Sequence, residues 1–157
     1  MPDHHASEQD IDLVASGLVS CLPALARAIE RQVGVRYPHP KPPEAQLALL
    51  RHAEANDGVT VRRAADALLM KPNNVSALVT TMTEQGMLER RQDPADKRIA
   101  HLHVTGSSRH QLNEVQHLMC DLVAQALRTM TDGELDALGS ALTALRALDE
   151  RLRPAAD

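Results

Sequence analysis

The stretch from Thr60 to Thr105 constrains the fold more than any other part of this 157-residue chain. Its pattern predicts a helix, a tight turn, a second helix and two short strands joined by a polar tip. Thr60 stands where a hydroxyl can cap the first helix, which we expect to extend to Leu69. Pro72 suits the first position of the second helix, because its missing N–H would have no partner there. Gly86 ends that helix as a residue that takes a positive φ easily.

The second helix has two chemically different faces. Apolar residues at three- and four-residue spacing predict a buried face: Val75, Leu78, Val79 and Met82. The opposite face carries Asn73, Asn74, Ser76, Ala77, Thr80 and Thr81. Asn amides can pair with adenine, hydroxyls can donate or accept, and an alanine methyl can contact thymine. Because Asn, Ser and Thr are mediocre helix formers, this face favours DNA-base contacts over the alternative of an ordinary solvated surface.

Two strands follow the second helix. Ala100, Leu102 and Val104 alternate with polar or exposed positions, which is the period of a strand, and residues 87–91 supply its partner. A polar tip over residues 92–97 joins the two strands. This arrangement directly after a helix-turn-helix predicts a winged helix, to which Val59 adds a short third strand.

Residues 43–105 resemble the MarR family of winged-helix transcription regulators. The resemblance is carried by residues 86–90, by the tip at 93–98, and by Leu102 to Thr105. It implies that Arg98 enters the minor groove and that Asp96 holds Arg98 by a charged hydrogen bond. Together, the helix face and the resemblance give these DNA-binding candidates: Asn73, Asn74, Ser76, Ala77, Thr80, Arg62, Arg63, Arg90, Arg91, Asp96, Lys97 and Arg98.

The sequence departs from the family in two places. Lys71 stands where a capping Ser or Thr is common, and Ala77 and Thr80 stand where a basic residue is frequent. The resemblance further implies a homodimeric, ligand-responsive repressor on a pseudo-palindromic operator. Its effector would be a small, often aromatic molecule, whose binding residues the sequence leaves unassigned.

The predicted organisation is a flexible N-terminus at 1–8 followed by a single domain at 9–157. Within this domain, residues 43–105 form the DNA-binding region, and residues 9–34 and 106–153 supply dimerisation helices. Pro23 predicts a kink or break in the first helix. Thr131 and Glu134 form a capping box before a last helix whose leucines approach a heptad pattern. These apolar stripes favour a two-fold dimer, although a monomeric bundle could also bury them.

Composition agrees with a mostly helical fold with a small β wing. The chain is 43% hydrophobic but has no Phe, no Trp and a single Tyr, so aliphatic residues must build its core. Residues 60–103 carry a net charge of +2 within a chain of net charge −4. A modest basic centre suits a DNA-binding region, but ordinary scatter of surface charge explains it almost as well.

Several other classes are disfavoured. There is no nucleophile elbow, phosphate-binding glycine loop or HExxH motif, so we expect no catalysis and no cofactor. We also expect no metal site, because neither His101 with His103 nor His110 with His117 has ligand partners at zinc spacing. No uninterrupted apolar run of membrane length and no secretory signal is visible, which predicts a cytoplasmic protein.

Two alternatives keep parts of this interpretation. One is a thiol-based redox-sensing regulator acting through Cys21, although no Lys, Arg or His lies within a helical turn to stabilise a thiolate. We therefore expect Cys21 to be buried and inert, and Cys21 and Cys120 not to form a disulfide framework. The other is a winged helix that binds a protein partner, for which an apolar recognition face would be the expected feature.

Overall fold

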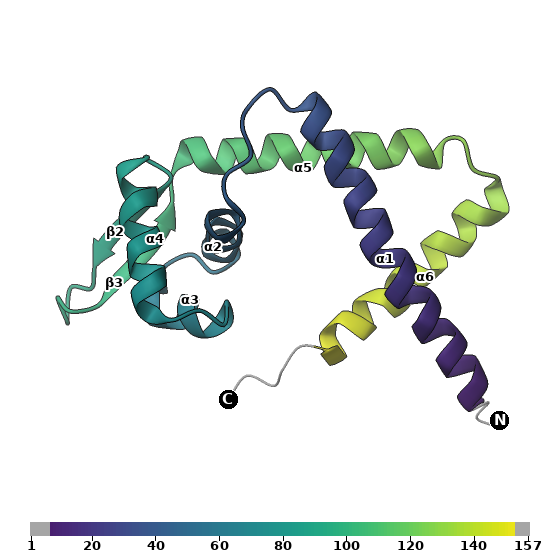
Figure 1. Cartoon of the computed structure of the whole chain (residues 1–157), viewed down its shortest axis with the longest axis horizontal. Coiled ribbons are helices and arrows are strands. Elements are labelled where there is room, and N and C mark those ends of the chain that lie inside the picture. Colours follow the sequence, from purple (N-terminus) through teal and green to yellow (C-terminus); the bar gives the residue numbers. More distant parts are fainter. Residues whose placement is uncertain (1–6, 153–157) are drawn as a thin grey trace. The chain divides into compact units, whose positions relative to one another are not determined.

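A computed structural model describes residues 7–152. In chain order the elements are α1 Glu8–Arg36, α2 Glu44–Ala55, β1 Val59–Thr60, α3 Val61–Ala67, α4 Pro72–Glu84, β2 Leu88–Gln92, β3 Ala100–Val104, α5 Gly106–Leu127 and α6 Asp132–Leu152. The protein is mostly helical with a small three-stranded sheet, which confirms the predicted fold class (Figure 1). Of the predicted flexible N-terminus, residues 1–6 lie outside the described residues, and Glu8 already begins α1.

The described chain divides into two compact units. Residues 33–118 form one unit, and residues 7–32 with 119–152 form the other. The predicted DNA-binding region, residues 43–105, lies entirely within the first of these units. The second unit contains most of α1, the end of α5 and all of α6.

An aliphatic core holds the winged-helix unit together. Its buried members come from α2, α3, α4 and the sheet: Leu49, Leu50, Ala53, Val59, Ala64, Ala65, Val75, Val79, Met82, Leu88, Leu102 and Val104. Val75, Val79 and Met82 of α4 are fully buried, while Leu78 packs half-buried against the same core. The predicted apolar face of this helix is therefore confirmed.

The sheet has the order β1-β3-β2 and is antiparallel throughout. Val59 pairs with Leu102, which confirms the third strand expected from the sequence. On the other side of β3, Leu88 pairs with Val104, and the ladder continues outward to Gln92. The inner ends of these strands contribute to the core, whereas every residue of β2 after Leu88 is exposed. The β2–β3 hairpin projects from the unit beside α4 (Figure 1).

Several elements begin or end where local sequence signals predict. The Thr60 hydroxyl accepts a hydrogen bond from the Arg63 amide at 3.3 Å, and the Thr105 hydroxyl accepts one from the Ser108 amide at 3.3 Å. Gly86 takes a φ of +70° after α4, as expected. The prediction that α3 reaches Leu69 is wrong: the helix ends at Ala67, because Leu69 adopts a φ of +53° in the turn.

The helices of the second unit differ from the winged helix in their exposure. The predicted break at Pro23 is absent, because α1 is helical from Glu8 to Arg36 with Pro23 inside it. No described residue of α1 or α6 is buried in the single chain. By length and composition α1 could cross a membrane, since one of its 18-residue windows has a mean hydropathy of 1.5. A helix whose apolar face packs on another protein chain would pass the same test.

Candidate nucleic-acid interface

The α4 helix presents its polar face to solvent because its opposite face is anchored in the core. The side chains expected to contact bases are all exposed: Asn73, Asn74, Ser76, Ala77, Thr80 and Thr81. Among the described residues, the side-chain amides of Asn73 and Asn74 have no hydrogen-bonding partner in the protein. Both donors and acceptors of these amides are therefore available to an external partner such as a base edge.

The two threonines of this face already use their protons within the helix. Thr80 donates its hydroxyl proton to the Ser76 carbonyl at 3.0 Å, and Thr81 donates to the Ala77 carbonyl at 3.2 Å. Each hydroxyl oxygen keeps lone pairs that can accept a hydrogen bond. In this arrangement Thr80 would act toward DNA as an acceptor, or as a donor after its hydroxyl rotates.

The start of α4 shows how the chain manages without the capping hydroxyl common in the family. Lys71 is the N-cap residue, and its side chain makes no capping hydrogen bond. Pro72 follows at the start of the helix, where its lack of an N–H removes one unsatisfied donor. The Lys71 carbonyl accepts from the amides of Asn74 and Val75 at 2.9 and 3.2 Å, which begins the helical hydrogen-bonding pattern.

The wing tip is organised by Asp93. Its Oδ1 atom accepts hydrogen bonds from the amides of Ala95 and Asp96 at 2.8 and 3.0 Å. Its own amide donates to the Ile99 carbonyl at 2.9 Å, which closes the loop between β2 and β3. An aspartate that binds amides two and three residues ahead holds a tight turn without help from regular secondary structure. The tip is therefore a defined structure in the free chain.

Asp96 holds Arg98 by a charged hydrogen bond, as the resemblance implies, and the bond is made to the main chain of Arg98. Asp96 Oδ1 accepts from the main-chain N–H of Arg98 at 2.9 Å, and no ion pair joins the two side chains in the described chain. The charged hydrogen bond thus fixes the backbone at Arg98. The Arg98 side chain is exposed and available to a groove or a phosphate.

The remaining basic candidates lie in different settings. Arg62 is exposed on α3, and Arg90 is exposed on β2. Arg91 forms an ion pair with Glu89 at 3.0 Å, so part of its charge is already compensated. Lys97 is exposed at the wing tip. Arg63 instead lines a hollow beside the wing strand.

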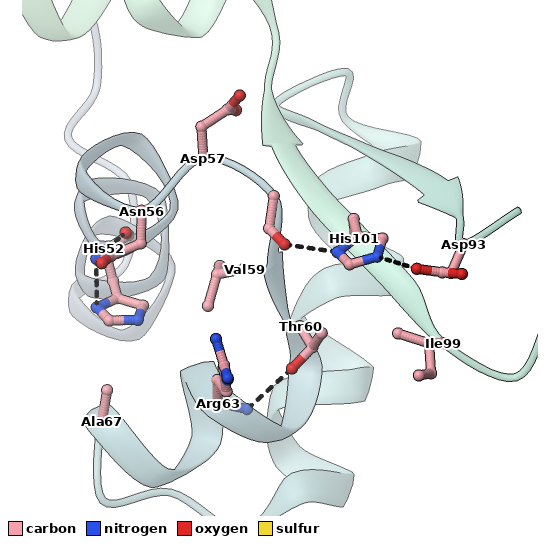
Figure 2. Close-up of a pocket in the computed structure, with 11 residues that line it drawn as sticks. His52, Asn56, Asp57, Val59, Thr60, Arg63, Ala67, Asp93, Ile99 and His101 are labelled. Atoms are coloured by element: carbon pink, nitrogen blue, oxygen red, sulfur yellow. Dashed lines mark hydrogen bonds and ion pairs between the residues drawn. The ribbon is translucent and has the colours of Figure 1, made fainter. Parts of the chain in front are cut away.

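This hollow of about 770 Å³ is bordered by the end of α2, the turn before β1, the start of α3 and the wing (Figure 2). Figure 2 shows Arg63 rising toward Val59 on one side of it and Ile99 on the other side. His52 and Asn56 of the α2 end are joined by a side-chain contact of 3.5 Å. The hollow therefore has a mixed polar and apolar lining, entirely within the winged-helix unit.

His101 bridges two segments that the sequence does not link in any obvious way. Its Nδ1 atom lies 2.7 Å from the Gly58 carbonyl oxygen, and its Nε2 atom lies 2.9 Å from Asp93 Oδ2 (Figure 2). The hydrogen bond to Asp93, followed by that to the Gly58 carbonyl, raises the pKa of His101 above its ordinary value. The same bond, with the amides of Asp96 and Ala95, lowers the pKa of Asp93.

A second histidine–aspartate pair lies two residues along the strand. His103 Nδ1 is 2.9 Å from Asp57 Oδ1 in the turn before β1, and this hydrogen bond lowers the pKa of Asp57. The sequence pattern flagged His101 and His103 as sharing a strand face, but it gave no signal that their partners are Asp93 and Asp57. Residues 8 and 46 positions away cannot be paired from spacing alone.

The sequence also raised the questions of a metal site and of reactive cysteines. Within residues 7–152, no three His, Cys, Asp or Glu side chains cluster as a metal site would require. Cys21 and Cys120 are both exposed in the single chain. The prediction that Cys21 is buried is therefore wrong for one copy of the protein, in which no described residue of α1 is buried.

Comparison with known proteins identifies the fold. Residues 42–99 match the model of the MarR family. A search of curated proteins by sequence finds no match. Solved structures do match. A putative transcriptional regulator from Pseudomonas aeruginosa is 23% identical, with a TM-score of 0.75 over 92% of this chain and 98% of its own.

Two further structures have the same fold. A MarR family protein from Bacillus stearothermophilus is 17% identical, with a TM-score of 0.69 over 88% of this chain and 97% of its own. FabT from Streptococcus pneumoniae, solved in complex with DNA, is 19% identical, with a TM-score of 0.65 over 92% of this chain and all of its own. The resemblance seen in the sequence is thereby confirmed: the chain has the fold of the MarR-family winged-helix transcription regulators, and its winged helix carries the sequence pattern of that family.

Proposed function

We propose that this protein is a sequence-specific duplex DNA-binding transcription regulator. The observation that carries the proposal is the α4 helix, whose apolar side is fixed in the core and whose polar side is exposed with unpaired asparagine amides. A helix of this kind fits the major groove, where Asn pairs with adenine through both its donor and its acceptor. The DNA complex of FabT, a protein of the same fold, supports this use of the fold.

The wing supplies the second contact. Its tip is held by Asp93 and Asp96, which leaves the side chains of Lys97 and Arg98 exposed at the end of the hairpin. An arginine presented in this way suits a narrow minor groove, where negative potential is concentrated. Arg62 and Arg90 would add contacts to phosphates, which provide affinity without sequence preference.

The functional form in this proposal is a homodimer. Large apolar side chains of α1 and α6 are about half or more exposed in the single chain, including Leu22, Leu25, Leu138 and Leu142. Exposed apolar surface on this scale favours burial against another chain, and two-fold dimers are the commonest solution. Two recognition helices would then reach half-sites about 34 Å apart on a pseudo-palindrome. A regulator that binds DNA in this way would act in the cytoplasm.

Repression and ligand response are the finer parts of the proposal. They come from the resemblance to the family, in which a small aromatic effector would weaken DNA binding by favouring a different spacing of the two recognition helices. If the effector changes the affinity of the protein for DNA by some factor, DNA must change the affinity of the protein for the effector by the same factor. A screen for compounds that release bound DNA would test this part.

The decisive experiment is selection of bound sites from a random duplex library, followed by binding measurements across a salt series. We expect a pseudo-palindromic site, and a logarithm of affinity that falls linearly with the logarithm of salt concentration. Binding without preference for any duplex would refute sequence-specific recognition. A complete lack of DNA binding would instead favour a winged helix that docks on a protein.

A further inference from the structure

We propose that His101 is a positioning residue for DNA binding. As an imidazolium it ties the wing tip to the turn between α2 and β1, and loss of one ring proton loosens the wing and weakens DNA binding. This inference rests on the proposed function, since it names a proton as a regulator of the same DNA-binding site. Its geometry nevertheless concerns the free protein and can be tested there.

The hydrogen bonds of His101 require two ring protons. Nδ1 lies 2.7 Å from the Gly58 carbonyl oxygen, and Nε2 lies 2.9 Å from a carboxylate oxygen of Asp93. A carbonyl and an ionised carboxylate can only accept hydrogen bonds, whereas a neutral imidazole has a single N–H. The imidazolium alone satisfies both acceptors. A neutral ring must give up either Gly58 or Asp93.

The bonds beyond Asp93 lead to the DNA-contacting end of the wing. Asp93 accepts a hydrogen bond from His101 on Oδ2, and on Oδ1 it accepts hydrogen bonds from the amides of Ala95 and Asp96. Asp96 in turn holds the main-chain amide of Arg98 at 2.9 Å. A continuous series of hydrogen bonds therefore joins the Gly58 carbonyl to the backbone that presents Arg98. Removing its first member breaks the side-chain link between the wing tip and the turn before β1.

The charged residues that face His101 from the neighbouring elements mostly have other partners. Arg91 is directly opposite His101 on β2, but it is paired with Glu89 at 3.0 Å. On β1 the opposite residue is the uncharged Thr60. Asp57 in the adjoining turn is engaged by His103. Asp93 is thus the carboxylate available to His101.

Two more basic groups line the same hollow, Arg63 of α3 and His52 of α2. The guanidinium charge of Arg63 disfavours a second proton on His101. The pKa of His101 is nonetheless raised, first by the hydrogen bond to Asp93 and then by the one to Gly58. These two contacts therefore outweigh the effect of the partial burial of the ring.

The sign of the pH effect follows from these shifts. Because the pKa of His101 is raised in the folded protein, its tie is complete below the ordinary histidine pKa of about 6.5 and is lost as pH rises through the raised value. Because the pKa of Asp93 is lowered, the contribution of its carboxylate to this contact is present above the ordinary aspartate pKa. It is lost only as pH falls through the lowered pKa. DNA binding should thus weaken as the pH rises above the ordinary histidine value and through the raised pKa of His101.

Two substitutions separate a proton-dependent tie from a merely structural histidine. His101→Gln leaves an amide whose two N–H donors share one nitrogen, so it cannot replace donors at both ring positions, and DNA binding should be weak and independent of pH. Asp93→Asn offers an amide oxygen to the Ala95 and Asp96 amides and an NH₂ donor to Nε2, which a neutral imidazole can accept. In that variant the neutral ring satisfies every partner, so the alkaline loss should disappear. His103→Gln on the same strand is the matched control.

The experiment uses the full chain and a duplex selected by the wild-type protein, with affinity measured by fluorescence anisotropy at constant ionic strength from pH 5.5 to 9. Wild-type affinity should fall at least about threefold as the pH rises across this range, since each linked proton, one in each subunit of the proposed dimer, allows at most about tenfold per pH unit. The His103→Gln variant should follow the wild-type curve, and Asp93→Asn should stay flat. Retention of the wild-type pH dependence by His101→Gln, or its loss in His103→Gln, would overturn the proposal.

Nitrogen-edited NMR of the imidazole groups tests the same tie without DNA. At pH 6 both ring nitrogens of His101 should carry protons, and the amide signals of Ala95 and Asp96 should titrate together with the ring. A neutral His101 ring at that pH, or tip amides that ignore its titration, would refute the tie directly. If the library yields no selected duplex, the proposed function fails while this measurement still decides the role of His101.

Discussion

The carboxylate of Asp96 accepts a hydrogen bond from the main-chain amide of Arg98 at 2.9 Å, and it makes no ion pair with the Arg98 guanidinium among residues 7–152. By binding the backbone, Asp96 positions the Arg98 side chain without neutralising the charge of the guanidinium. A guanidinium left free in this way retains its full attraction for DNA. This relationship makes the roles of the two residues separable by mutation.

Replacing Arg98 with alanine should lower affinity for the selected duplex by about tenfold, the loss expected for one arginine in a groove. Because Arg98 is exposed and holds no other residue, thermal stability and dimerisation should not change. Anisotropy titrations would measure the loss, with Lys97→Ala as the control at the neighbouring position. Equal losses of DNA affinity in both variants would show that the tip contributes only positive charge and that Arg98 has no specific contact in the groove.

Asn74 and Arg62 should differ in the kind of binding they support. Asn74→Ala should cost about 1–3 kcal/mol at the selected site and relax preference at one base pair, because its free amide is suited to a base edge. Arg62→Ala should weaken binding to all duplexes alike and reduce the salt slope by about one. Repeating the library selection with each variant would distinguish the two roles. An unaltered preferred site for Asn74→Ala would exclude it from base contact.

Leu69 occupies a backbone conformation that ordinary residues avoid. It takes a φ of +53° in the turn between α3 and α4, and its side chain is 96% exposed, so packing offers no compensation within the described chain. Leu69→Gly should raise the free energy of unfolding by about 0.5–1 kcal/mol, as relief from this conformation exceeds the added flexibility of the unfolded chain.

Urea denaturation would measure this gain, with Leu68→Gly as the control. Leu68 has a negative φ of −90° and packs half-buried against the core, so the same replacement there should destabilise the protein. If both variants lose stability, an unrecognised contact of Leu69 outweighs its backbone strain.

Much of the winged helix was predictable because its signals are local. The Thr60 cap, the turn at Pro72, the α4 stripe and the period-two pattern of β3 each depend on neighbours a few residues away, and the structure confirms all of them. The twelve-residue set of DNA-binding candidates stays a prediction.

The relationships that escaped prediction are long-range or are decided by context. The pairing of His101 with both Gly58 and Asp93 depends on how β3 meets the turn before β1, which no spacing rule reveals. Pro23 lies within a continuous helix, although a proline there lacks the amide that normally bonds to the preceding turn. Leu69 bends the chain where glycine would be the usual choice. In each case tertiary context overrides a local preference.

The exposed leucines of α6 predict that the proposed dimer can be broken without unfolding the winged helix. Leu138 and Leu142 are 45% and 51% exposed in the single chain. Replacing both with glutamate should therefore cost little in a monomer but should prevent burial against a second copy. Sedimentation equilibrium should show a shift from dimer to monomer, and affinity for the palindromic duplex should fall at least about a hundredfold as one half-site is lost. A double replacement at the exposed polar positions Asp136 and Arg146 is the control.

The capping box of α6 predicts a specific response to acid. Glu134 Oε2 accepts from the Thr131 amide at 2.9 Å and from its hydroxyl at 2.8 Å, while the Thr131 hydroxyl accepts from the Glu134 amide at 3.3 Å. The amide bond, then the hydroxyl bond, lowers the pKa of Glu134. Its stabilisation is therefore present above the ordinary glutamate pKa and is lost as pH falls through the lowered value.

Thr131→Ala should cost about 1 kcal/mol of stability at pH 7, as the loss of an N-cap hydroxyl generally does. Glu134→Gln should be less stable than wild type at pH 7, and the difference should shrink as wild-type Glu134 becomes protonated, because the neutral side chains then bind the amide comparably. Helix content followed by circular dichroism during urea titrations at pH 7 and pH 3 would measure both effects. Glu150→Gln, near the other end of α6, controls for the general effect of removing a negative charge. A constant difference between wild type and Glu134→Gln across this range would mean that the carboxylate charge contributes nothing to the cap.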